Sequence, residues 1–152
     1  MSIDIGVDKA GTSLRMLISQ ALEKYPSKSL LAFLDDSNVV VRTAAARQLQ
    51  VRGGVQTLEH AMRLTKSKKR REREIAAFIL GQLGTPKLPF KARSVPTLIE
   101  LCADSAHEVR AAALAALGHL QAIEADATIK RARRDANEDV RSMASFALRQ
   151  LK

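Results

Sequence analysis

Residues 104–120, DSAHEVRAAALAALGHL, determine the predicted fold of this chain. Apolar side chains recur in this stretch at the 3.6-residue spacing of an α-helix, which predicts one stripe that faces a core. The members of that stripe are Val109, Ala112, Ala113, Ala116, Leu117 and Leu120. Asp104 precedes the helix in a turn, where its carboxylate can accept backbone N–H groups.

The same pattern occurs in three clear copies along the chain and in a fourth, degenerate copy, which has Ser67 and Glu72 in place of the Asp and the Val. Its arginines are Arg42, Arg73, Arg110 and Arg141, which lie 31, 37 and 31 residues apart. The long interval contains GTPKLP at 84–89, and we expect this Gly- and Pro-rich cluster to be a loop insertion between two repeats. A second apolar-periodic segment precedes each copy, and these segments are 29–34, 55–64, 95–102 and 125–132.

Each repeat is therefore predicted to be a helix–turn–helix, with an additional helix at 13–25. A two-helix unit cannot bury its apolar stripe alone, whereas stacked units can. We predict an all-α protein, an α-α superhelix of about nine helices without sheet, and a single domain over 1–152. Its expected repeats are 29–52, 55–84, 95–120 and 125–151.

Composition narrows the protein class. The chain has 152 residues, of which 3% are aromatic and one is cysteine. The core must therefore be aliphatic, and an intrachain disulfide or a multi-cysteine zinc site is excluded. The sequence contains neither an apolar run of membrane-spanning length nor an N-terminal apolar stretch of signal-peptide length, which favours a cytoplasmic location.

The pattern Asp-x-x-x-x-Val-Arg-x-x-Ala-x-x-x-Leu-Gly-x-Leu resembles HEAT repeats, in particular the HEAT-like repeats first grouped with phycobilin (PBS) lyases. A narrower stretch, 44–84, looks like the YibA-type small HEAT proteins of enteric bacteria. Such proteins are often found beside Rhs-type toxin genes. This resemblance implies an α-solenoid and suggests an immunity role, the inhibition of a toxin.

The sequence offers no catalytic set, and we expect no enzyme activity. His60, His107 and His119 have no partner at metal-ligand spacing, so neither a metal nor a cofactor is predicted. Cys102 ends an apolar stripe and is predicted to be a core residue rather than a nucleophile.

The HEAT resemblance also suggests a structural role for the repeat arginines. In such solenoids the turn aspartate and this arginine stack along the repeats as a ladder, and the corresponding residues are Asp36, Arg42, Asp104, Arg110, Asp135 and Arg141. Arg73 is set apart because its own repeat has Ser67 in place of the turn aspartate.

Positive charge dominates: 25 Lys and Arg against 16 Asp and Glu give a net charge of +9. Such a balance favours an acidic partner. Two basic runs form a predicted basic edge of Arg63, Lys66, Lys68, Lys69, Arg70, Arg71, Arg73, Lys130, Arg131, Arg133 and Arg134. This edge is a solvated face, a site for an acidic protein, or a nucleic-acid site. Glu100, Asp104 and Glu108 lie in the repeat between the runs and would interrupt a phosphate track.

The second helices supply another candidate surface, because in HEAT-like solenoids they line the concave face. Matching positions there carry Arg47, Phe78, Gln82, His119, Phe146 and Gln150. The phenylalanines either pack against the neighbouring repeat or anchor a partner.

These features predict a non-catalytic module that binds a protein with an acidic patch. Nucleic-acid binding through 63–73 and 130–134 is the second hypothesis. A phycobilin-lyase-like or chaperone role is the third, and it follows from the repeat subfamily alone.

Overall fold

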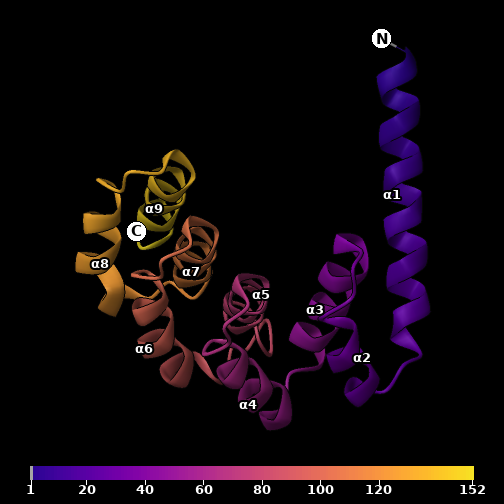
Figure 1. Ribbon diagram of the computed structural model, residues 1–152, viewed down its shortest axis with the longest axis horizontal. Coiled ribbons are helices and arrows are strands. Elements are labelled where there is room, and N and C mark those ends of the chain that lie inside the picture. The colour runs from indigo at the N-terminus through magenta and orange to yellow at the C-terminus, as the bar shows by residue number, and fades with distance from the viewer. Residues whose placement is uncertain (1) are drawn as a thin grey trace. The chain divides into compact units, whose positions relative to one another are not determined.

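The computed structural model describes residues 2–152, with side chains from Gly11 onward. Within that range the chain forms nine α-helices and one short 3-10 helix, without a strand, so the predicted all-α fold is confirmed (Figure 1). The helices are α1 (Ser2–Glu23), α2 (Ser27–Phe33), α3 (Val39–Arg52), α4 (Val55–Leu64), α5 (Arg70–Leu80), α6 (Lys91–Leu101), α7 (His107–His119), α8 (Asp126–Ala132) and α9 (Glu138–Gln150), and the 3-10 helix is Ile123–Ala125. The first helix begins earlier than the predicted 13–25.

The chain divides into two compact units between Leu49 and Gln50, inside α3. In the N-terminal unit, Leu22 of α1, Leu30 of α2 and Ala45 of α3 are buried and form a small aliphatic core. Each unit thus has its own core, and the single domain expected over 1–152 stays a prediction.

The C-terminal unit is built from two layers of helices (Figure 1). The second helices of its repeats contact one another in the order α5, α7, α9, and α4, α6 and α8 each pack against the second helix of their own repeat. Ala113 is fully buried, as the apolar stripe predicts, and so is Leu114, which lies outside that stripe. The unit is therefore an α-α repeat stack with an Ala- and Leu-rich core.

Two glycines let the second helices approach each other closely. A Cβ atom added at Gly81 would lie 2.7 Å from both Cα and Cβ of Ala116, and one at Gly118 would lie 3.0 Å from Cα of Ala147. The first repeat has Gln50 at the same register, eight residues after its arginine. This side chain is 3% exposed and donates its amide to the Phe78 carbonyl.

The loop insertion expected at 84–89 is a series of turns between α5 and α6. Gly84 has a φ of 78°, a left-handed conformation that favours glycine, and its N–H donates to the Gln50 carbonyl at 2.7 Å. This hydrogen bond ties the insertion to the end of α3. In the part of the chain that is described, no helix combines the length and the apolarity needed to cross a membrane.

Candidate binding surfaces

Two arginines join neighbouring repeats in the C-terminal unit. Arg73 of α5 donates Nε and Nη2 to the Asp104 carboxylate at 2.7 and 2.9 Å. Arg110 of α7 donates the same atoms to Asp135 at 2.9 and 2.8 Å. These four side chains are between 9% and 17% exposed. Each bidentate pair, here called a rung, fixes a second helix against the turn of the following repeat.

The rungs shift the pKa values of their members. The hydrogen bond from Arg73 lowers the pKa of Asp104, and that from Arg110 lowers the pKa of Asp135. The same bonds raise the pKa values of the two guanidinium groups. Both carboxylates are therefore held in the charged form.

The repeat arginines also close the turns of their own repeats. Arg42 donates Nη1 to the Asp36 and Ser37 carbonyls at 2.7 and 2.9 Å. Arg141 donates Nη1 to the Asp135 and Ala136 carbonyls, both at 2.9 Å. Among the described side chains, no carboxylate pairs with either arginine. All six residues of the predicted ladder thus make hydrogen bonds within the turns. Arg110 and Asp135 are the one pair among the six that forms a rung.

Arg73 was expected to stand apart from the ladder because its own repeat has no turn aspartate, and this reasoning is wrong. The carboxylate that meets a repeat arginine comes from the following repeat, so the absence of an aspartate in its own turn does not matter. Ser67 takes over the turn role in the second repeat, because its Oγ accepts the Lys69 N–H at 3.1 Å. Arg73 is therefore part of a rung rather than of a free basic edge.

Part of the first basic run is compensated by acidic side chains. Lys69 Nζ lies 2.9 Å from Glu72, and Arg70 Nη1 lies 2.6 Å from Glu108 and 3.7 Å from Glu74. The acidic third repeat thus engages this run directly. Arg63, Lys66 and Lys68 remain exposed beside it.

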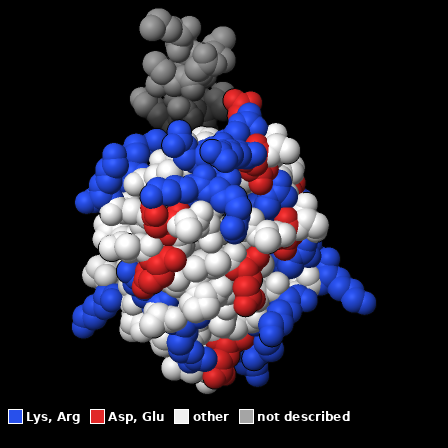
Figure 2. All heavy atoms as spheres, turned by 90° about the vertical axis from the view of Figure 1, so that its left-hand side faces the viewer, with Lys and Arg blue, Asp and Glu red and all other residues white. Residues whose placement is uncertain are grey.

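The second basic run is largely uncompensated by acidic side chains. Lys130, Arg131, Arg133 and Arg134 are all exposed, at the end of α8 and in the turn after it, and they line an open hollow of about 570 Å³. Lys130 pairs with Asp126 at 2.7 Å. No described carboxylate lies within ion-pair distance of the three arginines. We call these four residues the basic cluster. Figure 2 shows the face that carries α8, where Lys and Arg side chains gather in patches with Asp and Glu between them.

The residues expected on the concave face differ in their surroundings. Phe146 is half-buried, and its ring meets that of His119 edge-to-face at 5.4 Å. A Cβ atom added at Gly118 would lie 3.1 Å from Cε1 of Phe146, so this ring contributes to packing between α7 and α9. Of the other expected members, Arg47 and His119 are exposed, and Phe78, Gln82 and Gln150 are half-buried.

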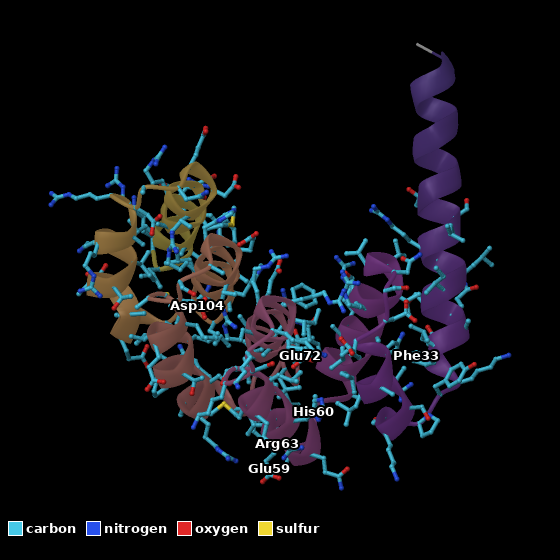
Figure 3. The ribbon with its side chains drawn as sticks, viewed as in Figure 1. Phe33, Glu59, His60, Arg63, Glu72 and Asp104 are labelled. Atoms are coloured by element: carbon cyan, nitrogen blue, oxygen red, sulfur yellow. The ribbon has the colours of Figure 1, made fainter. Side chains whose placement is uncertain are left out.

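No chemistry is assembled around the cysteine and the histidines. Burial raises the pKa of the Cys102 thiol to about 12, so it is not the thiolate that a nucleophile requires. His60 lies on α4 beside Glu59 and Arg63, Glu72 lies on α5 of the same repeat, and Asp104 lies in the following repeat (Figure 3). Burial and Arg63 lower the pKa of His60 against the effect of Glu72. From residue 11 on, no three His, Cys, Asp or Glu side chains form a group that could hold a metal.

The arrangement of paired helices with a repeated turn geometry agrees with a comparison against protein families. A family model of HEAT repeats matches residues 26–118 and again 62–149. The chain belongs to the HEAT-repeat family. HEAT repeats are generally protein-binding scaffolds and are usually non-catalytic, although enzymes also use the fold.

The relatives extend well beyond this chain. Protein YibA of Escherichia coli K12 is 39% identical over 61 residues, which make up 40% of this chain and 22% of YibA. The crystal structure of YibA superposes with a TM-score of 0.80 at 26% identity, covering 87% of this chain and 50% of that chain. The predicted resemblance to HEAT proteins and to YibA is therefore confirmed.

Two further solved structures share the fold. The complex of CpcE and CpcF of phycocyanin lyase from Nostoc has a TM-score of 0.65 at 22% identity, covering 93% of this chain and 90% of that chain. Human deoxyhypusine hydroxylase has a TM-score of 0.60 at 22% identity, covering 82% and 43%. At this identity the likeness establishes the fold alone. The immunity role stays a prediction, as does the cytoplasmic location.

Proposed function

We propose that this protein is a non-catalytic HEAT-repeat scaffold that binds an acidic segment of another protein through the basic cluster. The observation that carries the proposal is the exposure of Arg131, Arg133 and Arg134 around one hollow, without a carboxylate partner in the described structure. Exposed guanidinium groups without a partner can bind carboxylates through two parallel hydrogen bonds.

The extent of the cluster favours a short acidic segment over nucleic acid. Its four residues span 130–134, whereas binding along duplex DNA recruits phosphate contacts over a longer track. In the first basic run, which would have to extend that track, Lys69 and Arg70 are engaged by Glu72, Glu74 and Glu108. A toxin with an acidic patch would be one such protein partner.

Fluorescence anisotropy with two labelled probes tests the proposal. One probe is a 12-residue peptide of alternating Glu and Gly, and the other is a 20-base-pair duplex of random sequence. We expect the peptide to bind and the triple variant Arg131→Glu, Arg133→Glu, Arg134→Glu to weaken that binding about tenfold or more. Added salt should weaken it as well, because salt screens exposed charges.

The matched control is the triple variant Arg63→Glu, Lys66→Glu, Lys68→Glu, which makes the same charge change at exposed sites of the first run. It should bind the peptide nearly as well as the unmodified protein. Equal losses in the two variants would overturn the assignment to the basic cluster. Tighter binding of the duplex than of the peptide, lost in both variants, would establish the nucleic-acid function instead.

A further inference from the structure

The N-terminal unit has a hollow of its own, between α1 and α3. Its volume is about 260 Å³, and it is lined by Arg15, Ser19, Val39, Val40, Thr43, Ala44 and Arg47. Small-molecule pockets commonly measure roughly 300–1,000 Å³. This hollow is therefore of a size that suits a protruding side chain better than a whole organic ligand.

The lining combines an apolar surface with two unpaired positive charges. Val39, Val40 and Ala44 provide aliphatic surface, and Val39 is 60% exposed. Arg15 on α1 and Arg47 on α3 are exposed, and neither has an ion-pair partner among the described residues. The lining contains no carboxylate that could compensate the two guanidinium groups.

This combination limits what can cover the hollow. An apolar side chain placed in it would remove aliphatic surface from water, which is favourable. Insertion of that side chain would also place the partner over Arg15 and Arg47. A neutral or basic partner would then partly desolvate the two guanidinium groups without supplying an anion. A partner with carboxylates on both sides of its apolar side chain satisfies both requirements.

We infer that this hollow is a docking site for a protein segment in which an aliphatic side chain is flanked by carboxylates that pair with Arg15 and Arg47. The inference rests on the proposed function as a protein-binding scaffold. It concerns other residues in the other unit, however, so that it and the assignment of the basic cluster can fail separately. It also gives Arg47, expected on the concave face, a specific role.

Two labelled helical peptides of 15 residues test the inference on the full chain. Both carry a central leucine stripe, and the flanking positions are Glu in one and Lys in the other. We expect the Glu peptide to bind and the Lys peptide to bind at least tenfold more weakly. Similar affinities for the two peptides would overturn the requirement for carboxylates.

Three variants locate the site. Arg15→Glu with Arg47→Glu should weaken binding of the Glu peptide at least tenfold, and Ala44→Phe, which fills the hollow, should do the same. Lys24→Glu with Lys28→Glu makes the same charge change at exposed sites of this unit and should leave binding within about twofold. Equal losses in the two charge-reversal variants would overturn the assignment. If Ala44→Phe fails to fold, the exposed pair Arg15→Gln with Arg47→Gln supplies the decision.

Two further measurements separate the alternatives. Sedimentation velocity without peptide shows whether a second copy of the chain occupies the hollow, and self-association that Ala44→Phe abolishes would overturn the inference. The basic-cluster variant Arg131→Glu, Arg133→Glu, Arg134→Glu should retain the Glu peptide. Loss of the peptide in that variant alone would show that it binds at the cluster instead.

Discussion

Arg42 in the N-terminal unit and Arg110 in the C-terminal unit hold the same place in their repeats but make different bonds. Both donate Nη1 to two carbonyls of the preceding turn. Arg110 uses its remaining donors for the Asp135 carboxylate, whereas Arg42 meets no carboxylate in its unit. The hydrogen bonds of Arg42 close a turn, whereas those of Arg110 close a turn and also join two repeats.

The difference shows that a rung depends on two repeats rather than on one. The arginine is supplied by one repeat and the aspartate by the turn of the next, as in Arg73 with Asp104. The third and fourth repeats have an aspartate at that turn position, and the second has Ser67. Within the C-terminal unit, the rungs thus add charged links to an apolar stack of α5, α7 and α9.

The largest expected effect tests whether a carboxylate is tolerated only where an arginine meets it. Ala113 is fully buried in α7, so Ala113→Asp would place a carboxylate in the core without such a partner. We expect a loss of at least about 3 kcal/mol in the free energy of unfolding. Thermal unfolding should show a fall in Tm well above 2 °C, and a smaller change would mean that the register of the stripe is misassigned.

The rungs themselves are tested by removing one arginine from each kind of repeat. Arg110→Met keeps the aliphatic stem and leaves Asp135, which is 16% exposed, without its partner, so we expect a loss of about 2 kcal/mol. Arg42→Met loses only turn hydrogen bonds and should cost about 1 kcal/mol. Urea unfolding measures both. Equal losses would show that the turn bonds, and not the rungs, carry the stability.

Acid should weaken the rungs in a defined direction. Because the rung hydrogen bonds lower the folded-state pKa values of Asp104 and Asp135, their contribution is fully present above the unfolded value of about 3.9. It is lost as the pH falls from there through the folded pKa. Unfolding free energies measured from pH 5 to pH 2 should therefore fall less steeply in Arg110→Met than in the unmodified protein. An unchanged slope would contradict this origin of the pKa shift.

The sequence was sufficient for the fold because the fold depends on periodicity. The stripe around Val109 and Ala113 and the turn-forming Gly84 are local signals, and they predict a helix and a loop that the structure contains. The rung between Arg73 and Asp104 could also have been predicted from the sequence, by aligning each arginine with the aspartate of the next repeat. The hollow at Arg15 could not have been predicted, because it depends on how α1 packs against α3.

The smallest expected effect compares two arginines on one helix. Arg70 and Arg73 both lie on α5 and both face an acidic residue of the third repeat. Arg70 is 48% exposed and its partner Glu108 is 34% exposed, whereas Arg73 and Asp104 are 15% and 9% exposed. Exposed ion pairs contribute about 0–1 kcal/mol because water and salt screen them.

We therefore expect neutralising Lys68, Lys69, Arg70 and Arg71 together to leave the fold intact and to change the free energy of unfolding by less than about 1 kcal/mol. Arg73→Gln alone should cost more than all four, because it breaks a rung. Circular dichroism checks that the two variants are folded, and urea unfolding shows which of them loses more free energy of unfolding. An unfolded quadruple variant would show that this charged run is structural and that burial does not explain the difference between Arg70 and Arg73.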